Sequence, residues 1–211
     1  VPMMGTPAAS KLRTCRDEAH QATSRGHRVG AWARAAAGLA AAPAGRGPRT
    51  GRAVAHLDVM LEQPCKTLED CAAVRQATGL PMKIDEGAYD LASLMRAHEL
   101  GVLDAVALKL SKFGGLSAMR RARDLTVHLG AEICAECTWG SDIVTAASLH
   151  FAASTPQGAL LNTCDLSSYV GPRIAPDCPT RRDGRIAPPE GAGLGVTPDI
   201  DTLGPPILEL A

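Results

Sequence analysis

The sequence predicts an α/β fold built on a parallel sheet, and three observations lead to this prediction. From about residue 50 onward, short apolar runs alternate with longer amphipathic segments at a spacing of roughly 25 residues. Glycines and helix-capping residues separate these segments. Several of the apolar runs end in a charged residue. Such alternation is typical of parallel strands joined by right-handed crossover helices.

The individual elements follow from this pattern. Five strands are predicted, at 59–63, 80–85, 103–110, 131–137 and 159–163. Four helices are predicted between them, at 67–78, 90–101, 114–130 and 142–153. Thr67 and Asp90 are expected to be N-caps, and Gly79 is expected to end the first helix. The segment 171–205 is rich in proline and glycine, which predicts an extended tail that packs across the body.

Composition excludes several classes of partner. The chain has 211 residues and a net charge of +0, so no general attraction to nucleic acid or to an anionic membrane is expected. Aromatic residues make up 3%, too few for a surface on which bases stack. No apolar run reaches the ~18 residues that a membrane span needs, and the first residues lack the pattern of a signal peptide. We therefore expect a cytoplasmic protein.

Seven cysteines are scattered along the chain, and only Cys134 and Cys137 form a Cys-x-x-Cys pair. This pair lies in a predicted strand, where residues three apart point to opposite faces. A shared metal or a disulfide is therefore not expected, and the cysteines are interpreted as reduced, half-buried thiols.

The first 50 residues differ in composition from the rest. Residues 31–53 are almost entirely alanine, glycine, arginine and proline, and no acidic residue occurs between Ala19 and Leu57. Two interpretations are open: a mobile basic arm, or the translation of a GC-rich gene in the wrong frame. We favour the second, because the regular pattern begins abruptly near residue 50. The chain is accordingly divided into an aberrant, poorly ordered segment, 1–50, and a folded part, 51–211.

Three charged residues close consecutive predicted strands: Glu62, Asp85 and Lys109. The carboxyl ends of parallel strands meet at one edge of a sheet, which is where barrels of this kind carry out chemistry. Two carboxylates suit Mg²⁺, and a lysine beside them could act as a base if its pKa were lowered. Such a site could remove a proton α to a carboxylate. The alternative is that each charge only ends a strand and meets solvent.

Several motifs, in order and spacing, resemble the enolase superfamily. They are 61–64 (Leu-Glu-Gln-Pro), 84–86 (Ile-Asp-Glu), 108–115 (Leu-Lys-Leu-Ser-Lys-Phe-Gly-Gly) and 189–196 (Pro-Glu-Gly-Ala-Gly-Leu-Gly-Val). The resemblance covers roughly residues 50–205 and is to the mandelate racemase and muconate lactonising branch. Segments 107–117, 138–140 and 161–163 are similar to cis-3-hydroxy-L-proline dehydratases and to proline-betaine epimerases.

The resemblance implies the C-terminal part of a modified barrel, (β/α)₇β, here without the N-terminal capping domain. It makes Glu62 and Asp85 ligands of Mg²⁺, with Glu86 in the outer shell of the metal. It makes Lys109 the acid/base residue and gives Lys112 a structural role. Trp139 and Asp165 would line the substrate pocket.

The implied reaction is removal of the α-proton of a cyclic amino acid followed by loss of its 3-hydroxyl as water. A racemase or epimerase acting on proline betaines or other amino-acid derivatives is the alternative. The implied partner is a small carboxylate substrate, and the whole protein is expected to be a homo-oligomer.

Two family motifs are missing. The family places Lys-x-Lys and Asp-x-Asn before the strand of Glu62, and residues 1–50 contain neither. One metal ligand and one base are therefore lacking, so we expect weak Mg²⁺ binding. Three hypotheses remain: part of a dehydratase or epimerase, a fragment without activity, and a binding module that uses the pocket without chemistry.

Overall fold

A parallel sheet of five strands forms the centre of the molecule. The computed structural model describes residue 56, residues 59–169 and residues 171–208. The strands are β1 (Leu61–Glu62), β2 (Met82–Ile84), β3 (Ala105–Lys109), β4 (Glu132–Glu136) and β5 (Leu160–Thr163). They are hydrogen-bonded in the order β1-β2-β3-β4-β5, and every pair is parallel. The predicted α/β class is confirmed, and the unclosed sheet corresponds to part of a barrel.

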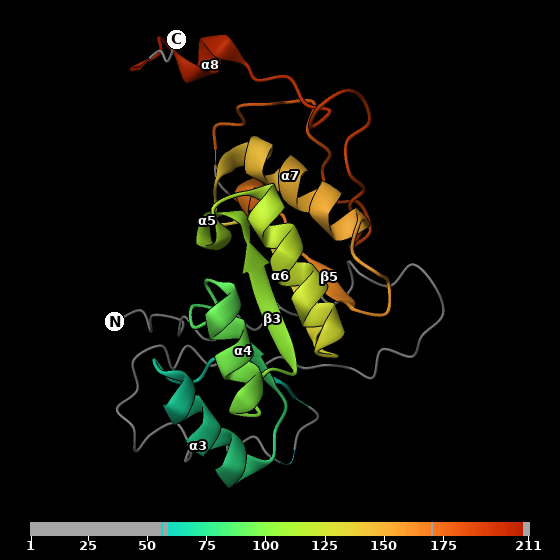
Figure 1. Ribbon diagram of the computed structural model, residues 1–211. Coiled ribbons are helices and arrows are strands. Elements are labelled where there is room, and N and C mark those ends of the chain that lie inside the picture. The colour runs from blue at the N-terminus through green and yellow to red at the C-terminus, as the bar shows by residue number, and fades with distance from the viewer. Residues whose placement is uncertain (1–55, 57–58, 170, 209–211) are drawn as a thin grey trace, which may run out of the picture.

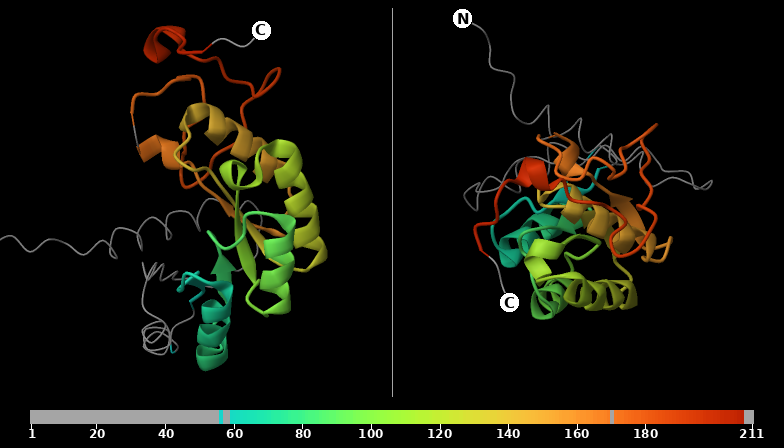
Figure 2. Two further views of the ribbon diagram at one scale, coloured as in Figure 1. Left: turned by 60° about the vertical axis from the view of Figure 1, so that its left-hand side comes forward. Right: turned by 90° about the horizontal axis from the view of Figure 1, so that it is seen from above.

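Helices connect the strands and cover one face of the sheet (Figures 1 and 2). The four long ones are α3 (Leu68–Thr78), α4 (Leu91–Glu99), α6 (Leu116–His128) and α7 (Ser141–Ala153). Shorter helices are α5 (Leu110–Phe113), the 3₁₀ helix η1 (Leu166–Tyr169) and α8 (Ile200–Leu203). Because consecutive strands are neighbours and the crossovers share one hand, the connecting helices lie on the same side. No helix in the described part of the chain is both long and apolar enough to cross a membrane.

The predicted caps are present. The Thr67 side chain accepts a hydrogen bond from the Asp70 backbone N–H, and Gly79 ends α3 with a φ of 68°. Asp90 and Ser93 form a reciprocal capping box at α4. The strand expected to extend to residue 110 instead ends at Lys109, and α5 begins at the next residue. Sequence pattern missed α5 because a helix of one turn has no apolar period of its own.

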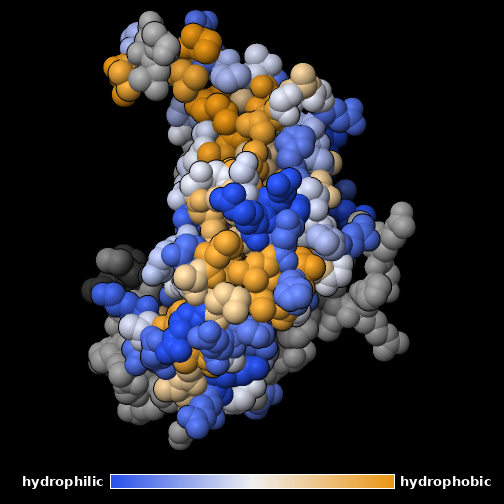
Figure 3. Space-filling view, in the orientation of Figure 1, coloured by the Kyte–Doolittle hydropathy of each residue, from blue (hydrophilic) through white to orange (hydrophobic). Residues whose placement is uncertain are grey.

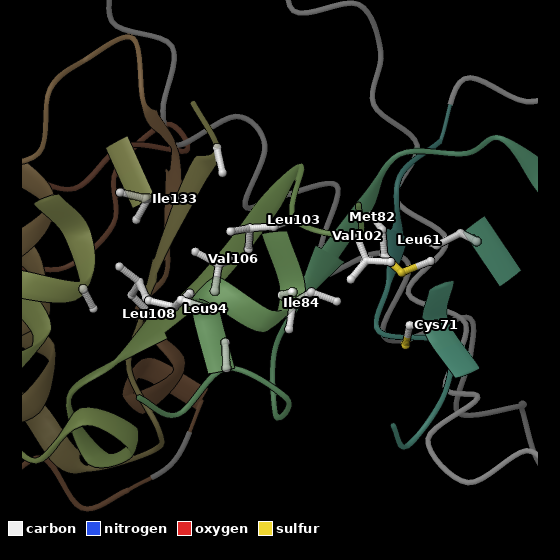
Figure 4. Close-up of a cluster of buried hydrophobic side chains, with 14 of the residues drawn as sticks. Leu61, Cys71, Met82, Ile84, Leu94, Val102, Leu103, Val106, Leu108 and Ile133 are labelled. Atoms are coloured by element: carbon white, nitrogen blue, oxygen red, sulfur yellow. The ribbon is translucent and has the colours of Figure 1, made fainter. Parts of the chain in front are cut away.

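The hydrophobic core lies between the sheet and these helices. Side chains alternate along a strand, so Val106 and Leu108 point toward the helices while Lys109 points to the opposite face. Figure 4 shows Ile84, Leu94, Val106 and other buried side chains gathered in this layer. The opposite face of the sheet carries the charged residues described below.

The C-terminal segment folds back on α7 and then leaves the body. Arg173 binds the buried carboxylate of Asp142, with Nη2 2.8 Å from Oδ1. Ala175 and Cys178 pack on Ala146 of α7. Beyond this anchor, α8 lies apart from the other helices, and exposed apolar side chains of α8 and of the residues after it lie in the region at the top of Figure 3. The prediction of a tail that packs across the body therefore holds for the stretch around 173–196.

The six cysteines in the described residues are all buried, and none is in a disulfide. The expectation of half-buried thiols was therefore wrong. The predictions for segment 1–50, including the missing motifs, concern residues outside those that the structure describes.

Candidate active site

Three carboxylates converge on the face of the sheet opposite the helices. Glu62 ends β1, Asp85 follows β2, and Glu136 ends β4. Each can offer one oxygen such that the three oxygens lie within 4.8 Å of one another. We call Glu62, Asp85 and Glu136 the acidic cluster. The predicted meeting of Glu62 and Asp85 is thus confirmed, and Glu136 is an addition that the sequence reasoning missed.

Lys109 joins the acidic cluster at the end of β3. Its Nζ lies 2.6 Å from Asp85 Oδ2, 2.7 Å from Asp85 Oδ1 and 3.3 Å from Glu136 Oε2. Lys109 and Glu136 are paired residues of neighbouring strands, which explains why their side chains share a face. The predicted convergence of Glu62, Asp85 and Lys109 around one small volume is therefore confirmed.

A second lysine, Lys83, lies at the centre of the same face. It is 1% exposed, and its Nζ is 3.0 Å from Glu62 Oε1 and 2.8 Å from Glu136 Oε1. Glu136 therefore bridges Lys83 and Lys109. A third lysine, Lys112 of α5, donates to the backbone carbonyl and the Oδ1 of Asp85 at 2.6 and 3.1 Å.

The electrostatics of the cluster favour charged side chains. Burial alone would lower the pKa of Lys109, but the carboxylates of Glu136 and Asp85 outweigh burial and raise that pKa. Burial likewise opposes ionisation of Glu136, yet the ammonium groups of Lys83 and Lys109 lower its pKa to about 2. The idea that the pKa of Lys109 is lowered is therefore wrong for the chain with no cation bound.

The loop that carries Asp85 is positioned by Gln63. The Gln63 side-chain oxygen accepts hydrogen bonds from the backbone N–H of Asp85 and of Gly87, at 2.9 and 2.8 Å. A Cβ at Gly87 would lie 2.9 Å from the Leu68 side chain and 3.2 Å from Gln63 Oε1, so a larger residue here would require these two side chains to shift. Gln63 itself has a φ of 26°, which is uncommon for a residue other than glycine.

The predicted pocket residues lie at the ends of β4 and β5. Trp139 is 54% exposed and has a φ of 59°, and its ring centroid is 6.4 Å from that of Tyr169. Asp165 is buried, with Oδ1 3.6 Å from Arg181 Nη1, close enough for an ion pair but too long for a hydrogen bond. Arg181 also stacks over Tyr169, 5.4 Å from its ring centroid. Trp139 is therefore linked to Asp165 by a chain of contacts through Tyr169 and Arg181.

Glu86, expected in the outer shell of the metal, directly follows Asp85 and is exposed. Its predicted role stays a prediction.

Two charged residues inside apolar strands could have revealed the missed part of the site. Lys83 stands between Met82 and Ile84, and Glu136 follows a buried run in the way that Lys109 does. A charge in a strand that is otherwise buried needs a partner of opposite charge. That signal was available in the sequence, but it does not say which partner is chosen.

The acidic cluster fits a hard divalent cation, because three carboxylate oxygens lie close enough to share one. Among the described residues, however, three lysines already contact these three carboxylates. We predict that this chain binds Mg²⁺ only at millimolar concentrations or above, measured by isothermal titration calorimetry. Micromolar affinity would contradict the prediction.

Cys137, next to Glu136, has an unusual thiol. A hydrogen bond from Cys164, with others from groups of Ser167, Thr145 and Leu166, outweighs burial and lowers its pKa to about 6. The N–H of Leu166 lies 3.0 Å from the Cys137 sulfur. The folded state therefore prefers the thiolate.

This preference predicts a pH dependence of stability. The ordinary thiol pKa is 9.0, so the unfolded chain holds more protons between pH 6 and 9, and the free energy of unfolding should rise over that range. The rise attributable to Cys137 is at most about 4 kcal/mol. Urea denaturation measured at several pH values should show that Cys137→Ala loses this rise of the free energy of unfolding between pH 6 and 9. Cys71→Ala should keep the rise, because burial raises the pKa of the Cys71 thiol to about 12.

Comparison with known proteins identifies the family. A model described as "Enolase C-terminal domain-like" matches residues 32–202. The match begins upstream of the boundary expected near residue 50, and the placement of that boundary stays a prediction.

Two curated relatives were found among others. One is a cis-3-hydroxy-L-proline dehydratase from Roseibium aggregatum, 41% identical over 155 residues, which are 74% of this chain and 42% of the relative. Another is muconate cycloisomerase 1 from Rhodococcus opacus, 30% identical over 68% of this chain and 39% of the relative. The chain spans less than half the length of these relatives.

Solved structures agree with these matches. A mandelate racemase/muconate lactonizing enzyme from Roseovarius nubinhibens is 39% identical, with a TM-score of 0.75 over 79% of this chain and 45% of that chain. A member of the enolase superfamily from the same organism, complexed with magnesium, is 32% identical, with a TM-score of 0.70 over 76% and 45%. With its open parallel sheet and its strand-end residues, this chain belongs to the enolase superfamily, in the mandelate racemase and muconate lactonising branch.

Proposed function

We propose that the chain supplies the C-terminal part of the barrel of a Mg²⁺-dependent lyase. The lyase would remove the α-proton of a cyclic amino acid and eliminate water, as the name of the cis-3-hydroxy-L-proline dehydratase relative indicates. The observation that carries the proposal is the contact of Lys109 with Asp85 inside the acidic cluster. A base and cation ligands held within one small volume suit abstraction of a proton next to a carboxylate.

In this proposal, each residue of the site has a distinct role. Glu62, Asp85 and Glu136 would hold Mg²⁺, which when bound would stabilise the negative charge that develops on the substrate carboxylate. The neutral amine of Lys109 would accept the α-proton. The electron pair left on the α-carbon would then expel the 3-hydroxyl, which leaves as water after taking up a proton.

Lys109 must lose its proton before it can act. Its pKa is raised by Glu136 and Asp85, so neutralising those carboxylates removes the cause of the shift. Cation binding and activation of the base are therefore linked through the same oxygens. Since lysines already balance the cluster, this chain alone is not expected to turn over substrate.

Trp139 and Asp165 are proposed to line the substrate pocket. Trp139 presents an exposed ring from a backbone conformation that only a few per cent of residues other than glycine adopt. Asp165 and Arg181 would then fix the position of the Tyr169 ring against Trp139.

A chimera tests the proposal. In it, residues 59–208 of this chain replace the matching part of the Roseibium aggregatum dehydratase, which supplies the remaining strands. NMR in D₂O with cis-3-hydroxy-L-proline and Mg²⁺ reports both α-proton exchange and loss of the 3-hydroxyl. We expect both. Exchange without loss of the hydroxyl would instead indicate a racemase or epimerase, and a folded chimera with neither reaction would overturn the proposal.

A further inference from the structure

Lys83 competes for the oxygens that a cation would use. Its Nζ contacts Oε1 of Glu62 and Oε1 of Glu136, two of the three members of the acidic cluster. A cation shared by the cluster must coordinate oxygens of the same two carboxylates. The ammonium group and the cation therefore compete for overlapping positions.

Lys83 is also the most enclosed of the lysines at this site. Its side chain is 2% exposed, compared with 14% for Lys109 and for Lys112. A buried ammonium is costly unless it is paired, and Lys83 is paired on both sides. Lys109 and Lys112 each keep some contact with solvent, whereas Lys83 is almost fully enclosed on β2.

The charges in the described part of the site sum to zero when all groups are ionised. Three carboxylates face Lys83, Lys109 and Lys112. Adding a dication to a balanced, largely buried group of charges leaves an excess of positive charge, which partial burial makes unfavourable. Lys83, whose side chain is 2% exposed and contacts two of the carboxylates, therefore adds directly to the charge that a cation would meet.

We propose that Lys83 is a resident counter-ion for Glu62 and Glu136, which holds the two carboxylates together with no cation bound and weakens the binding of a divalent cation to the acidic cluster. It is a positioning residue, since it acts through the carboxylates. The inference rests on the proposed function only for the choice of Mg²⁺ as the cation.

The test compares Mg²⁺ binding in the chain and in Lys83→Met, which is unbranched, one atom shorter than lysine and uncharged. Isothermal titration calorimetry should show Mg²⁺ binding at least about tenfold tighter in Lys83→Met, because one close positive charge is gone. Thermal unfolding should show a lower Tm for the variant without Mg²⁺, and a larger rise in Tm on adding Mg²⁺ than the unmodified chain gives. A purely structural role would lower the Tm without tightening Mg²⁺ binding.

Two variants act as controls. Lys83→Arg keeps the charge and should keep the weak binding of the unmodified chain. Lys66→Met removes an exposed lysine beyond β1 and should leave Mg²⁺ binding unchanged. If Lys83→Met does not fold without Mg²⁺, the same comparison is made with Lys83→Gln, which retains a polar end.

The inference is overturned if the neutral variants bind Mg²⁺ no more tightly than the unmodified chain, or if Lys66→Met tightens binding equally. Substrate turnover is not measured in this experiment. A chimera that lacks dehydratase activity would therefore count against the proposed function and leave the inference about Lys83 intact. Unchanged Mg²⁺ binding in the neutral Lys83 variants would overturn that inference and leave the proposed function intact.

Discussion

Replacing Lys109 with alanine in the chimera is expected to lower the rate of α-proton exchange by roughly three orders of magnitude. Lys109 is the one described lysine that contacts two members of the acidic cluster and keeps some exposure, so it is placed to reach a substrate held there. The measurement is the rate at which deuterium from D₂O enters the α-position of cis-3-hydroxy-L-proline.

Lys66→Ala is the matched control for Lys109→Ala. Lys66 is exposed and lies between β1 and α3, so its loss should leave the exchange rate within twofold, on the order of the effect of an ordinary surface substitution. An unchanged exchange rate in a folded Lys109→Ala chimera would remove the assignment of the base. If Lys109→Ala exchanges slowly but still binds Mg²⁺, the fall in the exchange rate is due to lost proton transfer and not to a lost cation.

Changing Glu136 to glutamine is expected to lower the free energy of unfolding of this chain by about 3 kcal/mol at neutral pH. The substitution keeps the shape of the side chain but removes the charge that Lys83 and Lys109 share. Among the described residues, Lys83, which is buried, then keeps Glu62 as its one carboxylate partner. Urea denaturation monitored by circular dichroism measures the difference.

The cost of Glu136→Gln should depend on pH. A carboxylate whose pKa is lowered in the folded state stabilises that state above its ordinary pKa, here 4.5, and loses the contribution as the pH falls toward about 2. The gap between the unmodified chain and the variant should therefore close over this range. Glu99→Gln, which removes an exposed carboxylate 3.7 Å from Arg96, should cost less than about 0.5 kcal/mol at any pH. A Glu136→Gln variant as stable as the unmodified chain would contradict the bridging role.

Much of the fold could be predicted because its signals are local. The N-cap residues Thr67 and Asp90 and the glycine stop at Gly79 mark helix ends through groups close in sequence. The predicted strand ends were less accurate, because an apolar run can extend beyond the residues that pair with a neighbouring strand. Residues 59–60, which precede β1, are an example. α5 is a single turn, and nothing in a short apolar run separates it from the strand before it.

The site was predicted in part, for a similar reason. Glu62 and Lys109 end their strands and Asp85 directly follows β2, so topology alone brings the three to one edge. Lys83 and Glu136 are 53 residues apart, and their contact depends on side chains reaching across the strand between them. The direction of the Lys109 pKa could not be foreseen, because it is Glu136 that contributes most to raising it.

The order of the strands in the sheet has a consequence for how the chain reaches this structure. Each strand pairs with the one that precedes it in sequence, so every new strand finds its partner already synthesised. Each pairing closes a short loop that holds one long helix and its turns, with the single-turn helix α5 added between β3 and β4, and this keeps the entropic cost of every step small. Assembly can therefore follow translation from the ribosome, with each strand and helix added to the growing edge of the sheet.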